Sequence, residues 1–429
     1  MDTDRVALSY NQIRRLDRDK SVFAGRQREP HHISAAFDLA GHVSVPALRR
    51  AVQEVVRRHS SLRTTFHQEG YGRILPPGGV LRVVELDIDL ESLTRAEMDE
   101  LFDLERDLKL RVTLVRTGEA MSRLIITVEH LVCDGQSFDR LLADLACAYN
   151  GGDSGASSDF FPWAEAERLA LTGSALEERL AFWRTRLDPL EAVPEIRLAG
   201  MADPIDGQGG AATLRLDVEP GVVEELRAFC AKNAASLHTG VMAGLQLAVF
   251  ANTGRTTVGV VGPISLPTDD RERAIGWFSN LAVFRTRVDS GGPVEDLVAG
   301  ARDAMFDAID QLIPLPLLVQ HLQPGREDAL RWRPWLYLDS DWWDEDPLPL
   351  AGLKISRVDD TFVPALRPGV GVWANVNGPD PHLFMQWESG AWPEDAARTF
   401  LQTFRDCLSL IARSSGATCA ELAAAARKQ

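Results

Sequence analysis

Apolar residues recur along the chain in two alternating rhythms, one typical of strands and one typical of helices. Residues 33–39 and 124–128 are short, mostly apolar runs, which predict buried strands. Between them, Ser44 is placed to cap a helix that has Pro46 in its first turn. The apolar residues of that helix share one face at helical spacing: Leu48, Val52, Val55 and Val56.

The same alternation continues along the chain and predicts a mixed α/β protein. We expect further strands at 110–115, 257–261, 336–338, 353–358, 371–375 and 382–387. We expect further helices at 138–149, 163–187, 238–252 and 393–412, the last followed by an alanine-rich tail. A chain of 429 residues is too long for one compact core, so we expect two domains, 1–172 and 173–429.

The charge balance narrows the classes of partner. A formal net charge of -16 without a dense basic run argues against nucleic-acid or acidic-membrane binding, because both depend on clustered Lys and Arg. The first twenty residues are too charged for a signal peptide, and no apolar run approaches the roughly 18 residues that span a bilayer. We therefore expect a soluble, cytoplasmic protein. Its 5 cysteines are scattered, which makes disulfides and a zinc site unexpected.

The segment EHLVCDG, residues 129–135, concentrates reactive side chains between a predicted strand and a predicted helix. His130 is the candidate for proton transfer, because imidazole has the unperturbed pKa nearest to neutral. Cys133 stands beside it, but a thiol nucleophile and its base usually come from separate segments. We therefore interpret Cys133 as a small apolar filler.

Several motifs, in order along the chain, resemble those of the condensation-domain family of nonribosomal peptide synthesis, within the chloramphenicol-acetyltransferase-like superfamily. The matching segments are LSYNQ (8–12), RHSSLRTTF (58–66), EHLVCDG (129–135), DFFPW and FWR (159–163 and 182–184) and IGWFSN (275–280). The resemblance covers nearly the whole chain. It implies an α/β fold of two acetyltransferase-like lobes in a V-shaped pseudo-dimer, with the EHLVCDG signature at the centre of a tunnel.

The resemblance also assigns roles. It makes His130 the catalytic histidine, either as a base or as a group that orients the nucleophile; the sequence leaves both open. It implies that Asp134 is structural and forms a salt bridge with Arg63, and we expect Gly135 to permit a tight turn. Glu129 departs from the histidine usual at its position. It is able to raise the pKa of His130 or to pair with a nearby arginine, and we expect activity to be retained.

Five further residues are candidates for substrate contact, whereas His31 and His32 are not candidates for the site. The predicted substrate-binding residues are Ser137, Trp277, Asn280, Trp342 and Trp343. Trp342 and Trp343 belong to a tryptophan-rich, acidic region. This region either contacts substrate or packs between the lobes, and the sequence leaves both alternatives open. His31 and His32 imitate the start of a signature but no Asp-Gly follows, so we expect them at a strand edge.

These features together predict a free-standing condensation enzyme of natural-product or antibiotic biosynthesis, because no adenylation, carrier or thioesterase motif accompanies the lobes. It would transfer an acyl or aminoacyl group from the phosphopantetheine thioester of a separate acyl or peptidyl carrier protein to an amine or alcohol. Arg14, Arg15 and Arg18 are candidates for docking the carrier, and no metal or tightly bound cofactor is implied. The alternatives are an inactive module that recruits a partner enzyme, an acyl-coenzyme-A-dependent acyltransferase, and an epimerase.

Overall fold

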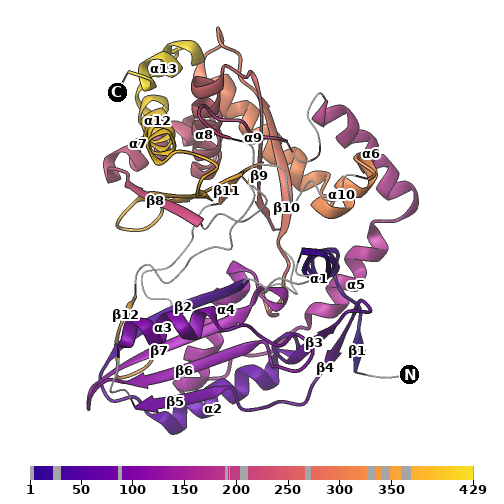
Figure 1. Cartoon of the computed structure of the whole chain (residues 1–429), viewed down its shortest axis with the longest axis vertical. Helices are drawn as coiled ribbons and strands as arrows, with labels where there is room; N and C mark the ends of the chain where they lie inside the picture. Colours follow the sequence, from indigo (N-terminus) through magenta and orange to yellow (C-terminus); the bar gives the residue numbers. More distant parts are fainter. Residues whose placement is uncertain are drawn as a thin grey trace. The chain divides into compact units, whose positions relative to one another are not determined.

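The computed structural model describes residues 4–22, 30–85, 89–188, 192, 194–202, 211–265, 272–325, 335–339, 348–358 and 369–428, with the backbone alone for 18–22. The chain divides into two compact units (Figure 1). Unit 1 comprises Met1–Thr172, Ser265–Ser279 and Glu345–Ala365, and unit 2 comprises the remainder. The sequence analysis placed segments 265–279 and 345–365 in the second domain, 173–429. In the structure both segments belong to unit 1.

Unit 1 is built on a five-stranded sheet of order β12-β2-β7-β6-β5. Its strands are β12 (Lys354–Arg357), β2 (His32–Ala40), β7 (Met121–Glu129), β6 (Leu110–Arg116) and β5 (Leu81–Glu85). All neighbours are antiparallel except β5 and β6. In the β2–β7 register, His32 stands opposite Glu129.

Helices cover both faces of this sheet. Helix α3 (Leu90–Asp99) places Leu90, Leu93 and Met98 against the buried cluster of Ala36, Val115 and Ile125. Helices α2 (Val45–Arg58) and α4 (Gly135–Tyr149) pack against each other behind the sheet in the view of Figure 1. Ser44 caps α2 as predicted, because its hydroxyl accepts the N–H of Ala47.

A second, smaller sheet completes unit 1. Strands β1 (Arg5–Val6), β4 (Tyr71–Ile74) and β3 (Thr64–His67) pair antiparallel, and the short 3-10 turn η1 (Ser60–Arg63) leads into β3. Helices α1 (Tyr10–Val22) and α5 (Phe160–Ala170) also belong to this unit.

Unit 2 contains a six-stranded sheet of order β10-β9-β11-β13-β14-β8. Its strands are β10 (Asn280–Arg287), β9 (Thr257–Ile264), β11 (Trp335–Asp339), β13 (Gly369–Asn375), β14 (His382–Glu388) and β8 (Ala211–Asp217). Its helices are α6 (Gly173–Leu187), α7 (Pro220–Lys232), α8 (Leu237–Thr253), α9 (Val294–Asp310), α10 (Leu315–Leu322), α12 (Glu394–Arg413) and α13 (Cys419–Ala426). Helix α8 is buried on nearly all sides, and α12 packs against both α7 and α8.

The predicted strands are present, with their ends shifted by a few residues. Two predictions about the elements are wrong. The single helix expected at 163–187 is two helices, separated at 171–172 where Gly173 adopts a positive φ of 59°. The strand expected at 353–358 pairs with β2 in unit 1 and not within the second domain. The alanine-rich tail, for which no element was predicted, forms α13. Among the described residues, no single helix is long and apolar enough to span a membrane; α7 and α8, bent by 103°, meet that test only as a pair.

Candidate functional site

The EHLVCDG segment forms the connection from β7 to α4. Strand β7 ends at Glu129, the 3-10 turn η2 covers His130–Val132, and Asp134 is the N-cap of α4. Glu129 is fully buried, whereas His130 is partly exposed. Side chains alternate across a strand, so Glu129 lies on the same face as Ile125, which α3 covers. The signature therefore buries the Glu129 carboxylate and leaves His130 partly exposed.

Two side-chain amides of helix α1 hydrogen-bond to this connection and to the end of the loop at 272–279. The side-chain amide of Gln12 donates to the carbonyl oxygen of Leu131 at 2.8 Å, and that of Asn11 donates to Ser279 O at 3.1 Å. The LSYNQ motif thus contacts both the signature and the IGWFSN motif. Its polar residues serve as a scaffold for the site.

Asp134 joins the signature to the loop at 272–279. Its Oδ1 caps α4 by accepting the N–H of Ser137 at 3.0 Å, and its Oδ2 accepts the N–H groups of Phe278 at 3.0 Å and Ser279 at 2.8 Å. The expected ion pair with Arg63 is not among the contacts of the described residues; the Arg63 guanidinium donates instead to Leu75 O at 2.7 Å. Asp134 is structural, as the family resemblance implies, but it acts through these backbone amides.

Ser137 and Gly276 reinforce the same junction. The Ser137 hydroxyl donates to Gly276 O at 2.8 Å and accepts the Gly276 N–H at 3.2 Å, and the N–H of Asp134 donates to Gly276 O at 3.1 Å. The prediction that Ser137 binds substrate is therefore wrong in this structure, because its hydroxyl is buried and engaged with the loop. A Cβ on Gly276 would lie 2.1 Å from Cδ2 of Phe160, so this position has no room for a side chain.

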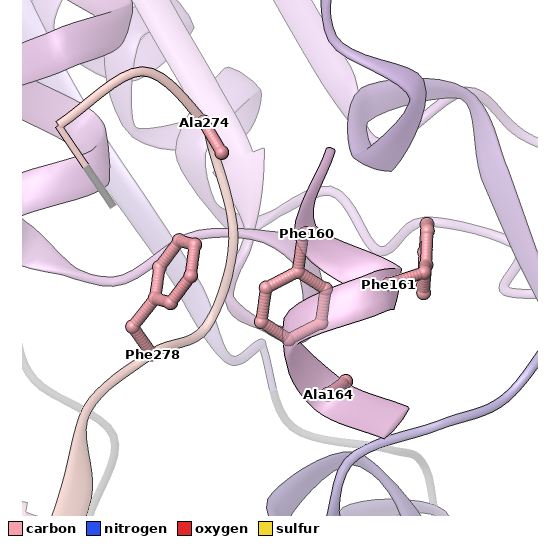
Figure 2. Close-up of a cluster of buried hydrophobic side chains, with 5 residues drawn as sticks. All are labelled: Phe160, Phe161, Ala164, Ala274 and Phe278. Carbon is pink, nitrogen blue, oxygen red and sulfur yellow. The ribbon is translucent and has the colours of Figure 1, made fainter. Parts of the chain in front are cut away.

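Apolar packing holds the loop on α5. Figure 2 shows Ala274 and Phe278 of the loop together with Phe160, Phe161 and Ala164 of α5. The rings of Phe160 and Phe278 meet edge to face with centroids 5.1 Å apart. The DFFPW motif therefore anchors the loop that carries Trp277.

Two rings flank His130, the partly exposed residue of the signature. The indole of Trp277 lies 4.8 Å from the His130 ring, centroid to centroid, and is itself partly exposed. The imidazole of His31 stacks on that of His130 at 4.6 Å, with an angle of 16° between the planes. His31 does precede the edge of β2, as predicted, but sequence reasoning missed its place at the site. The available signal was the pair of histidines at the start of an apolar strand.

Buried charges lie beneath these rings. The Arg15 guanidinium contacts Nδ1 of His31 and lies 3.7 Å from Oε1 of Glu129, and Nε2 of His32 lies 3.5 Å from Oε2 of Glu129. Arg15 is 3% exposed, so the prediction that it docks a carrier is wrong. The side chain of Arg18 is outside the described residues. Glu129 thus lies near an arginine, and pairing with an arginine was one of the two roles that the sequence left open for it.

Cys133 and Gly135 have no direct chemical role in this geometry. Cys133 is fully buried, and desolvation raises the pKa of its thiol well above the usual value, which keeps it protonated. Gly135 does not adopt a positive φ and a Cβ there would meet open space, so the described structure gives no conformational reason for a glycine at this position. The positive end of a helix can stabilise an anion, but at the start of α4 the Asp134 carboxylate already places negative charge there.

The remaining predicted substrate contacts lie in unit 2 or outside the described residues. Asn280 is buried at the start of β10 and belongs to unit 2. Trp342 and Trp343 lie outside the described residues. From the same aromatic region, Trp335 and Tyr337 are buried in β11, and Tyr337 packs on Trp373 at 5.4 Å.

Comparison with solved structures shows the fold. The condensation domain of the Monacolin K polyketide synthase MokA superimposes with a TM-score of 0.80 at 15% identity, covering 97% of this chain and 99% of that one. The complex of the X-domain and OxyB from teicoplanin biosynthesis gives 0.78 at 22% identity, covering 97% and 95%. The chain therefore has the mixed α/β, chloramphenicol-acetyltransferase-like fold of condensation domains.

Sequence relatives are nonribosomal peptide synthetases. A linear gramicidin synthase of Brevibacillus parabrevis is 27% identical over 323 residues, which are 69% of this chain and 4% of that protein. A probable non-canonical synthetase, CymA, of Salinispora arenicola is 31% identical over 322 residues, again 69% and 4%. This chain thus spans a small fraction of these relatives. The Condensation domain family model matches residues 25–331, most of the sequence, and the chain belongs to the condensation-domain family.

Proposed function

We propose that this chain transfers an acyl or aminoacyl group from a carrier-protein phosphopantetheine thioester to an amine or alcohol, with His130 as the catalytic residue. The observation that carries the proposal is the position of His130, a partly exposed residue at the end of β7 with its ring beside Trp277. Acyl transfer needs a group that relieves the nucleophile of its proton, and an accessible imidazole is suited to this.

The chemistry balances without a redox partner. The nitrogen or oxygen of the acceptor forms a bond to the acyl carbon, and the C–S bond of the thioester breaks. The proton of the acceptor passes to His130, or is oriented by it, and ends on the departing thiol. The donor arm is part of the substrate, and the product is an amide or an ester.

Two other functions have specific support. The X-domain of teicoplanin biosynthesis was solved in complex with OxyB, which favours a module that recruits a partner enzyme. Glu129 is the sequence feature in favour of this alternative. The starter condensation domain of rhizomide synthetase was solved, as its R148A mutant, with C8-CoA, which favours a coenzyme A thioester as donor.

Intact-protein mass spectrometry distinguishes the three functions. An acyl-loaded carrier protein is mixed with candidate amines and alcohols and with the chain. We expect acyl loss from the carrier and a new product with the wild-type chain, and neither with His130→Ala. His42→Ala removes an imidazole of the same unit outside the site and should transfer at the wild-type rate. Carrier binding without transfer to any acceptor would overturn the proposal in favour of recruitment. Transfer from acyl-coenzyme A alone would identify the other donor.

A further inference from the structure

We propose that His31 is a positioning residue for His130, and that Arg15 and Glu129 hold it in that role as a neutral imidazole. The inference deepens the proposed acyl transfer and rests on it for its kinetic part only. It also gives Glu129, the departure from the family signature, a physical purpose.

The backbone fixes the two histidines as neighbours. Strand β2 pairs antiparallel with β7, with His32 opposite Glu129 at the strand ends. The N–H of His130 then donates to the carbonyl oxygen of His31 at 3.0 Å, which extends the pairing by one residue. The position of His31 is therefore set by the sheet and does not depend on a loop.

The rings are then stacked on one side of the site. The 16° angle and 4.6 Å separation place the face of His31 against the face of His130, while Trp277 is tilted at 52° to His130. With Trp277 at 6.1 Å from His31, the three rings form one cluster. Stacking favours this ring plane, because turning the His130 ring out of it would separate the two faces.

Arg15 selects the proton position on His31. A guanidinium has only donors, so its contact with Nδ1 of His31 requires that nitrogen to accept, and the His31 proton resides on Nε2. A second proton on His31 would place two cations in contact. The ring that stacks on His130 is therefore kept neutral, and it accommodates His130 as imidazole or as imidazolium.

Glu129 supplies a counterion for the buried Arg15 guanidinium. The two side chains are 0% and 2% exposed, and an arginine buried without a counterion is costly. His32 also faces Glu129, and the nearby Asp134 carboxylate accepts three backbone N–H groups. The order of contacts runs from Glu129 to Arg15, then to His31, and then to His130.

Imidazole NMR of the folded chain tests the arrangement without any substrate. Long-range ¹H–¹⁵N spectra of ¹⁵N-histidine protein should show His31 as the Nε2–H tautomer, still neutral when the pH is lowered from 8 to 5.5. His31→Ala should shift the His130 ring signals, assigned by their loss in His130→Ala. His67→Ala, which removes a partly exposed imidazole of the same unit, should leave them unchanged. A His31 that takes up a proton as an exposed histidine does, or unchanged His130 signals in His31→Ala, would overturn the inference.

Transfer kinetics supply the second readout. His31→Ala should lower kcat roughly tenfold or more with little change in KM, because a loosened catalytic group weakens the reaction step more than substrate binding. His31→Phe keeps a flat ring against His130 and should recover part of the loss. Equal kcat in wild type and His31→Ala would contradict a positioning role. A chain that transfers nothing would defeat the proposed function, while the NMR result would still decide the role of His31.

Discussion

Asp134 accepts the backbone N–H of Phe278 at 3.0 Å across 144 positions of the sequence. The same oxygen also accepts the N–H of Ser279. One carboxylate therefore ties the start of α4 to the loop that carries Trp277.

Asp134→Asn should loosen this loop. The substitution replaces a charged acceptor by a neutral one, and hydrogen bonds to charged groups are worth about 1.5–3 kcal/mol. Hydrogen exchange of the Phe278 and Ser279 amides should accelerate by roughly tenfold or more. Arg63→Ala is the matched control, because Arg63 bonds to Leu75 and not to Asp134 among the described contacts. Equal acceleration in Arg63→Ala would revive the ion pair implied by the family resemblance.

Gly276→Ala should destabilise unit 1. The added methyl would lie 2.1 Å from Phe160, and such overpacking costs typically about 1–3 kcal/mol. Gly135→Ala adds the same methyl to open space and should change the unfolding free energy by no more than about 0.5 kcal/mol. Urea unfolding followed by circular dichroism measures both. A Gly276→Ala chain as stable as Gly135→Ala would show that the loop readily moves away from α5.

Glu129→His restores the residue usual in the family, yet it should lower both stability and transfer. The substitution removes the buried counterion of Arg15, and breaking a buried ion pair costs about 3–5 kcal/mol. Glu100→Gln is the control, because Glu100 lies 3.5 Å from Arg111 with its side chain 59% exposed, where a pair is worth at most about 1 kcal/mol. Thermal unfolding and transfer rate are the measurements. An unchanged or more active Glu129→His would refute the role assigned to Glu129.

Asp144 should make the stability of unit 1 depend on acid pH. Burial raises its pKa, but hydrogen bonds from His59, Arg140 and Ser154 outweigh burial and lower the pKa to about 2. Since this lies below the value of 3.8 expected in an unfolded chain, Asp144 stabilises the fold above pH 3.8, by about 2 kcal/mol. That contribution is lost as the pH falls through about 2.

Asp144→Asn tests this dependence. The variant should be less stable than wild type by about 2 kcal/mol or more between pH 5 and 7, and the difference should shrink as the pH falls below 3.8. Denaturation midpoints at several pH values give the comparison. A gap that stays constant down to pH 2.5 would mean that the Asp144 charge is not what stabilises the fold.

The sequence by itself determined the class of fold, the family and the position of the signature segment along the chain. Strand and helix periods are local properties, so the regions of β2, β7, α2 and α4 could be recognised from spacing alone. The motifs are also local strings, and their order carried the family resemblance that the comparisons confirm.

Only the tertiary structure decided which distant residues meet at the signature. The loop that satisfies Asp134 follows it by more than 130 positions, and β12 joins β2 from the far end of the chain. His31 reaches His130 through a strand register, and Arg15 reaches Glu129 from a separate helix. Such pairings depend on strand register and on how buried charges are neutralised, and both involve partners that lie far apart in the sequence.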